Sequence, residues 1–177
     1  KGKETSAEIL EAKPGKVGTY RVVKASAGPY QGELALDLGF SSYLSLGMLF
    51  PKRWPQDSAG FFGAGRGVTD FQEGDIVSSP AGKLEKLKDA SETDLYTYRA
   101  YVDEITDGDT FWALIDLGFG ITTKQQLRLR GLDAPEVESA DGREAKAFLE
   151  KQLTKNGAPV LIKTVKSDKY DRYLADV

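Results

Sequence analysis

A series of alternating, β-rich segments, interrupted once by a helical segment, constrains the fold of the second half of this chain most strongly. We expect five strands there, at residues 97–105, 111–117, 126–132, 158–165 and 172–177. Between the third and the fourth, Ser139 or Asp141 can cap a helix that runs to about Lys155. The apolar face of this helix would comprise Ala145, Phe148, Leu149 and Leu153. Five strands with one helix after the third predict an OB-type barrel in a mainly β protein.

The first half of the chain also predicts short strands, at residues 18–25, 32–38, 43–50, 74–78 and 82–87. Here Asp37, Gly39 and Phe40 lie 79 residues before Asp116, Gly118 and Phe119, in similar surroundings. This half is therefore either a second, degenerate OB-like barrel or a helper β-domain of unrelated ancestry. A polar, charge-rich stretch at residues 83–94 suggests the boundary. We predict an accessory β-domain at residues 1–93 and a barrel domain at residues 94–177.

Two residue types are missing from the sequence, and their absence limits the possible chemistry. The chain has no His and no Cys, which excludes disulfides, thiol nucleophiles and Ser-His-Asp triads. A metal ion would be a hard cation held by oxygen atoms. The net charge of −3 argues against coating of nucleic acid by bulk charge. No apolar run approaches the roughly 20 residues that span a bilayer.

Three charged motifs in the second half can form one site. The first has Asp107 and Asp109 in a turn, and the second joins Arg128 to Asp133 and Glu136. The third contains Lys169, Tyr170 and Arg172. Each motif alone is typical of an ordinary turn or of a solvated strand face. Together they offer two carboxylates for a hard cation, two arginines to offset phosphate charge and a carboxylate to activate water.

The order of these motifs, DGDT, then RLxGxDxPE, then DKYxR, resembles the staphylococcal nuclease (thermonuclease) family over about residues 98–177. The resemblance implies a Ca²⁺-dependent phosphodiesterase that cleaves DNA and RNA and leaves 3′-phosphate ends. It implies that Asp109 and Asp133 bind calcium by their side chains and Ala134 by its backbone carbonyl. Asp107 would lie just behind these ligands.

The same resemblance implies the remaining roles. Glu136 would activate or orient water, and Arg128 and Arg172 would bind the scissile phosphate and stabilise the transition state. Lys169 and Tyr170 would contact a terminal phosphate of a single-stranded or frayed substrate. The preference for DNA or RNA, the oligomeric state and the role of residues 1–93 stay open. The lack of Cys slightly favours a secreted or cell-envelope protein, and a start at Lys1 fits a removed targeting segment.

Two features depart from the family pattern. Asp171 stands where Gly is usual, and the chain stops five residues after Arg172, whereas the family continues into further helices. We therefore expect a barrel domain truncated at its C-terminus. The alternative function is a catalytically inactive nucleic-acid-binding or scaffold module. Every charged catalytic position of the motifs holds the expected residue type, which favours the nuclease.

Overall fold

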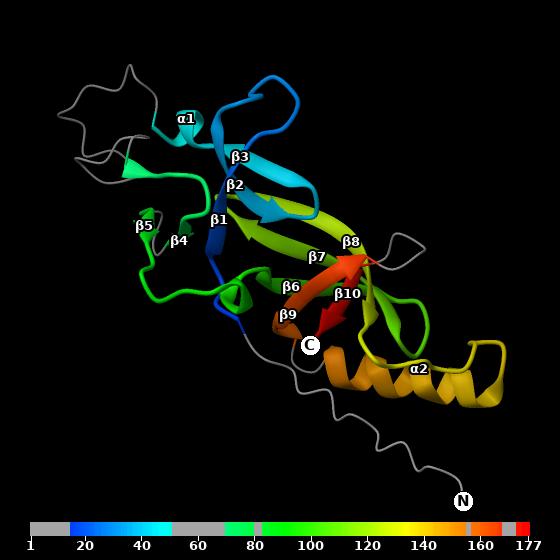
Figure 1. The fold of residues 1–177 in the computed structure, drawn as a ribbon. Coiled ribbons are helices and arrows are strands. Elements are labelled where there is room, and N and C mark those ends of the chain that lie inside the picture. The colour runs from blue at the N-terminus through cyan, green and yellow to red at the C-terminus, as the bar shows by residue number, and fades with distance from the viewer. Residues whose placement is uncertain (1–14, 51–69, 80–82, 155–156, 168–172) are drawn as a thin grey trace, which may run out of the picture.

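The computed structural model describes residues 15–50, 70–79, 83–154, 157–167 and 173–177. It is mainly β, with a five-stranded sheet in the first half of the chain and a closed five-stranded barrel in the second. Figure 1 shows the sheet on one side of the molecule and the barrel on the other, with the main helix at the far end of the barrel. The predicted fold class is confirmed.

The barrel has the strand order β10-β8-β7-β6-β9, and its neighbours are antiparallel except for the parallel pair of β8 and β10. That parallel pair closes the barrel. One helix, α2, follows the third strand, so the predicted OB-type layout is correct. The elements are β6 (Thr97–Ile105), β7 (Thr110–Gly118), β8 (Ile121–Leu129), α2 (Ala140–Leu153), β9 (Val160–Ser167) and β10 (Tyr173–Asp176).

Alternation of side chains builds the barrel wall. In β7, Phe111, Ala113 and Ile115 are fully buried, while the residues between them face outward. The helix α2 begins after Ser139, whose side chain accepts a hydrogen bond from the Gly142 N–H at 2.9 Å.

Two details of the predicted barrel are wrong. Phe148 is 64% exposed rather than packed on the barrel, although Leu149 and Leu153 of the same predicted face are buried. The third strand begins at Ile121, five residues before the predicted start. It begins early because Phe119 and Gly120 both adopt positive φ, which makes the connection from β7 a tight turn.

The first half of the chain forms an antiparallel sheet with the strand order β3-β2-β1-β4-β5. Only the beginning of predicted strand 43–50 is extended. Residues Leu46–Leu49 form the short helix α1, because the Ser45 side chain accepts a hydrogen bond from the Gly47 N–H at 3.1 Å. The elements are β1 (Thr19–Lys24), β2 (Leu34–Gly39), β3 (Ser42–Ser45), α1, β4 (Ile76–Ser78), β5 (Glu85–Lys86) and the 3₁₀ turn η3 (Glu92–Asp94).

The strand order of this sheet repeats that of the barrel. Because the barrel is closed, its order can be read from β8, as β8-β7-β6-β9-β10. In both units the order is then third, second, first, fourth and fifth strand. The fifth barrel strand also pairs with the third, whereas no pairing of β5 with β3 occurs within the described residues. This order is that of an OB barrel left open between two strands, which favours the degenerate-barrel interpretation over unrelated ancestry. The boundary between residues 93 and 94 stays a prediction.

The two units pack through equivalent residues. The Tyr20 hydroxyl donates to the Leu117 carbonyl at 3.0 Å, and the Tyr98 hydroxyl donates to the Leu38 carbonyl at 3.0 Å. Tyr20 also contacts Phe119, with ring centroids 5.2 Å apart. In the same way, Tyr98 contacts Phe40 at 5.3 Å. Each unit therefore offers one tyrosine to the second-strand turn of the other.

The turns that receive these tyrosines are built alike. The Gly39 N–H donates to Asp37 Oδ1 and the Gly118 N–H to Asp116 Oδ1, each at 2.9 Å. Both glycines have positive φ, and a Cβ on Gly118 would lie 2.1 Å from the Tyr20 hydroxyl. The repeat seen in the sequence at these positions is thus a repeat of structure. One continuous buried core runs through both units.

Candidate active site

The turn between β6 and β7 places the first two predicted site residues. The Asp109 N–H donates to Asp107 Oδ1 at 3.1 Å, which fixes the Asp107 side chain within the turn. Between them, a Cβ on Gly108 would lie 2.6 Å from the Ala145 Cβ and 2.7 Å from the Ala134 Cβ. Glycine therefore lets the turn pack closely against α2 and the loop before it. This contact brings the turn to the second motif.

Asp109 is the buried centre of the site, with 3% of its surface exposed. Its Oδ1 accepts a hydrogen bond from the Thr110 hydroxyl at 2.7 Å. Its Oδ2 accepts one from the Ala134 N–H at 3.3 Å and forms an ion pair with Arg128 Nη2 at 2.8 Å. A carboxylate held this firmly offers a fixed negative charge at the barrel rim.

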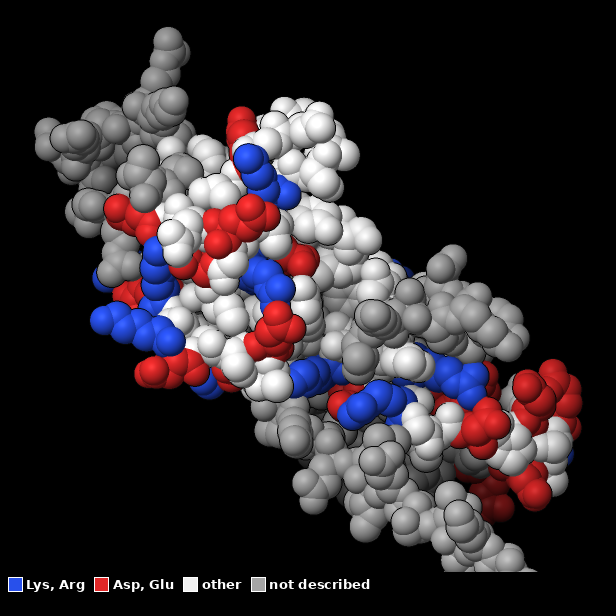
Figure 2. All heavy atoms as spheres, in the orientation of Figure 1, with Lys and Arg blue, Asp and Glu red and all other residues white. Residues whose placement is uncertain are grey.

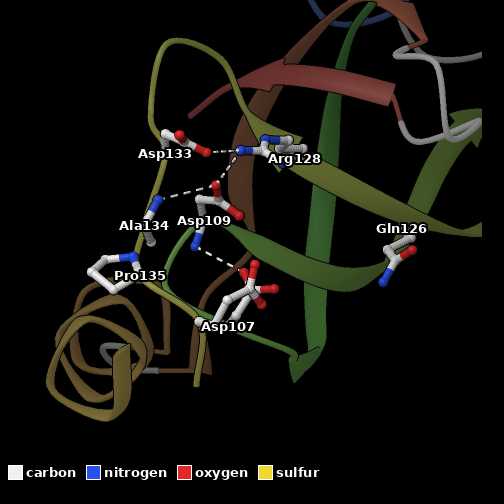
Figure 3. A pocket seen from close by; sticks show the side chains of 8 residues that line it. Asp107, Asp109, Gln126, Arg128, Asp133, Ala134 and Pro135 are labelled. Carbon is white, nitrogen blue, oxygen red and sulfur yellow. Dashed lines mark hydrogen bonds and ion pairs between the residues drawn. The ribbon is translucent and has the colours of Figure 1, made fainter. Parts of the chain in front are cut away.

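Arg128 joins the two predicted cation ligands. Its Nη2 lies 2.8 Å from Asp109 Oδ2 and 2.6 Å from Asp133 Oδ1, so both carboxylates meet at one nitrogen atom. Figure 3 shows Asp133 and Asp109 turned toward Arg128 from two separate loops. The Asp133 side chain is 95% exposed, so it can reorient at little cost. The Asp109 side chain is 5% exposed and is held in place.

These residues line an open pocket of about 490 Å³. Its walls carry Asp107, Asp109, Gln126, Arg128, Asp133, Ala134, Pro135 and Glu136. Glu136 is exposed, and its backbone carbonyl accepts hydrogen bonds from the hydroxyl and N–H of Ser139, the cap of α2. The start of the helix thus fixes the backbone from which the Glu136 carboxylate extends.

A hard cation fits the donor set of this pocket. Calcium takes oxygen ligands at roughly 2.3–2.6 Å. Arg128 Nη2 sits at 2.6 and 2.8 Å from one oxygen of each carboxylate, so a cation at or near that position would reach both. Among the described residues, no group of three or more acidic side chains gathers as a metal cluster. The ion pairs with Arg128 bring the carboxylates of Asp109 and Asp133 together, and the other ligands of a cation would be backbone oxygens or water.

Not every predicted site residue can be placed. The structure brings together Asp107, Asp109, Arg128, Asp133, Ala134 and Glu136. The contact seen for Ala134 is made by its N–H, so the predicted carbonyl ligand stays a prediction. The third motif, with Lys169, Tyr170 and Arg172, lies outside the described residues.

Three further residues contribute to the site and were not expected from the sequence. Gln126 and Pro135 line the pocket, and Thr110 holds Asp109. Strand alternation could have found Gln126, which precedes Arg128 by two residues on the same face of β8. Arg130 lies just after the end of β8 and binds Asp176 of β10 through two hydrogen bonds of 2.7 Å, which tie the end of β8 to β10.

Residues 126–177 match a protein-family model described as staphylococcal nuclease homologue. This region is staphylococcal-nuclease-like. The match includes Arg128, Asp133 and Glu136 but begins after Asp107 and Asp109. The structure connects these two aspartates to the matched segment, because the β6–β7 turn lies against that segment in the same barrel. No curated protein matches the chain.

On the face seen in Figure 2, the described residues do not form a uniformly basic surface. Figure 2 shows positive and negative side chains interspersed on the face in view, with acidic side chains gathered at the end where α2 begins. Asp141 lies in the first turn of that helix. The net charge of −3 likewise offers nucleic acid no bulk attraction. No helix in the described part of the chain is long and apolar enough to cross a membrane.

Proposed function

We propose that the chain is a calcium-dependent nuclease that hydrolyses phosphodiester bonds of DNA or RNA and leaves 3′-phosphate ends. Residues 94–177 would form the nuclease unit and residues 1–93 an accessory β-domain. The observation that supports this best is the meeting of Asp109 and Asp133 at a single nitrogen of Arg128. Glu136 lines the same pocket, so cation ligands, a phosphate-binding group and a carboxylate for water share one space.

Asp109 and Asp133 would hold the calcium ion, together with the carbonyl of Ala134. Asp107 would support them by fixing the turn that carries Asp109. When bound, calcium would supply positive charge to neutralise the phosphate oxygens. The oxygen-only donor set suits calcium better than zinc, because zinc usually takes His or Cys ligands.

Arg128 would bind the scissile phosphate and stabilise the charge that develops on it. A guanidinium has five N–H donors, and the contacts seen for Arg128 use Nη2, so Nε and Nη1 could engage a phosphate. Arg172, from the motif outside the described residues, would supply a second guanidinium. Two arginines of this kind stabilise a phosphorane-like transition state without histidine.

Glu136 would orient or deprotonate the attacking water. The water oxygen would bond to phosphorus and its proton would pass to the Glu136 carboxylate, while the bond from phosphorus to the 5′ oxygen breaks and that oxygen takes a proton from solvent water. The products are a 3′-phosphate and a 5′-hydroxyl end. Lys169 and Tyr170 would contact a terminal phosphate, which suits a single-stranded or frayed DNA or RNA substrate.

A cleavage assay with matched variants tests the proposal. The substrate is a labelled single-stranded DNA or RNA oligonucleotide, in calcium or in excess chelator. We expect Ca²⁺-dependent products with 3′-phosphate ends and a rate about 10²- to 10⁴-fold lower for Glu136→Gln. Glu138→Gln, which removes a charge two residues away, should cleave like the parent. Nucleic-acid binding without Ca²⁺-dependent cleavage would contradict the proposal and favour the inactive binding module.

A further inference from the structure

A partly apolar strip lies on the outer face of the barrel beside the pocket. It consists of Tyr101, Trp112, Leu114, Lys124 and Gln126, which we call the outer strip. Tyr101 is 49% exposed and Leu114 is 42% exposed, although both stand in the middle of strands. Exposed aromatic and aliphatic side chains at such positions do not contribute to the barrel core, and where they gather on one face they are typical of an interaction site.

The outer strip is continuous with the candidate active site. Gln126 lines the pocket and lies directly opposite Trp112 in the pairing of β7 with β8. Figure 3 shows Gln126 set apart from the cluster of Arg128 and its two carboxylates, at the edge of the pocket. Two residues further from the pocket, Lys124 lies opposite Leu114, which in turn lies opposite Tyr101 of β6.

The chemistry of the strip suits stacking better than phosphate binding. The Lys124 ammonium lies 5.7 Å from the centroid of the Trp112 ring and forms an ion pair with Asp103 at 2.5 Å. Glu104 lies opposite Trp112 on β6. Because these carboxylates offset the only lysine of the strip, phosphate groups gain little there. Aromatic faces bind any base by stacking, with little dependence on charge.

We propose that the outer strip binds bases of the single-stranded substrate that flank the scissile phosphate. This inference rests on the proposed nuclease function and adds the path of the strand. Four of its five residues lie on the second and third strands of the barrel, where OB folds commonly bind oligonucleotides, and Tyr101 extends the strip onto the first strand. Tyr101 and Trp112 offer the stacking surfaces, Leu114 offers apolar contact, and Gln126 leads the strand into the pocket.

Binding is measured on the intact chain in chelator, so that cleavage does not interfere. The probes are a fluorescent dinucleotide and a fluorescent eight-nucleotide oligothymidylate, compared by anisotropy. We expect Trp112→Leu, which keeps apolar bulk, to weaken octamer binding about 5- to 100-fold. Tyr101→Ala, at an exposed position, should weaken it in the same direction without disturbing the fold. The affinity for the dinucleotide should fall less than about twofold in either variant.

A control and a spectroscopic signal sharpen the test. Tyr43 is 60% exposed on β3 of the first unit, so Tyr43→Ala removes an exposed aromatic ring away from the strip and should change nothing. The chain has two tryptophans, so a Trp54→Phe variant reports Trp112 alone. Its fluorescence should be quenched by the octamer. Because stacking carries the contact, the slope of affinity against salt should be equal in Trp112→Leu and the parent.

The outcomes separate this inference from the proposed function. Parent-like octamer binding by both strip variants, with unquenched Trp112, would overturn the inference even if Ca²⁺-dependent cleavage is observed. A second outcome combines loss of octamer binding in both strip variants, quenching of Trp112 by the octamer, and no cleavage by the parent. This outcome would support base binding by the outer strip and reject the nuclease function. Failure of the parent to bind the octamer at all would overturn the inference.

Discussion

The paired tyrosines between the two units make a quantitative prediction for Gly118→Ala. The new Cβ would lie 2.1 Å from the Tyr20 hydroxyl, at a φ of +83°. A left-handed alanine costs roughly 1–2 kcal/mol. The displaced hydroxyl loses its bond to the buried Leu117 carbonyl, which costs about 1–3 kcal/mol. The free energy of unfolding should fall by ~3 kcal/mol, a decrease in melting temperature of about 6–12 °C for a chain of this length.

The control lies in the same hairpin. Gly120 has a φ of +75°, and a Cβ there would meet nothing within 4 Å, so Gly120→Ala measures the backbone cost alone. Calorimetry and urea unfolding should show the larger loss for Gly118→Ala. The double variant Gly118→Ala with Tyr20→Phe should lose ~1–2 kcal/mol less free energy of unfolding than the sum of the two single losses, since both substitutions remove the same hydrogen bond. Equal losses at both glycines, or strict additivity, would show that Gly118 does not protect the hydrogen bond from Tyr20 to Leu117.

Three further predictions concern the site, the tyrosines and the barrel closure. Arg128→Ala should cleave about 10²- to 10³-fold more slowly, yet bind calcium as tightly as the parent or more tightly in a calorimetric titration, because it frees both carboxylates. Burial raises the pKa of Tyr20 and of Tyr96 to about 12. The fold favours the protonated hydroxyls, so the stability they contribute is complete below about pH 10 and is lost as the pH rises toward 12. The urea midpoint of the parent should therefore fall over that range. The midpoint of Tyr20→Phe should fall less. Asp176→Asn should lower the free energy of unfolding in urea by ~1 kcal/mol, because it weakens the two hydrogen bonds from Arg130 that tie β10 to the end of β8. An unchanged urea midpoint would argue against that role.

The parts of the fold that sequence reasoning found are those with a local period or a local signal. Alternation located β6 and β7, and the two candidate caps, Ser139 and Asp141, located α2, whose cap is Ser139. The likeness of residues 37–40 to 116–119 indicated a second unit, whose strand order then proved to match. Local signals did not predict features that depend on how one element packs against another. The exposure of Phe148 follows from how α2 lies on the barrel, which helical periodicity alone does not give.

The site divides in the same way. Residue types and order were enough to nominate Asp109, Arg128 and Asp133, because their chemistry is restricted. Their meeting depends on contacts between distant segments, such as the Ala134 N–H to Asp109, which are 25 residues apart. The Tyr20 bond to Leu117 spans 97 residues. Such contacts have no periodic trace in the sequence, so the joining of the two units could not be predicted.

In the proposed nuclease, two aspartates from separate loops hold one calcium ion beside Arg128. Isothermal titration of calcium into the parent, Asp109→Asn and Asp133→Asn tests it most directly, with Asp141→Asn as a nearby control. Asp133 is suited to this test because its side chain is 95% exposed, so its amide should fold normally. We predict calcium binding by the parent and by Asp141→Asn, and at least tenfold weaker binding by each of the other two. Parent-like calcium affinity in both Asp109→Asn and Asp133→Asn would contradict the account.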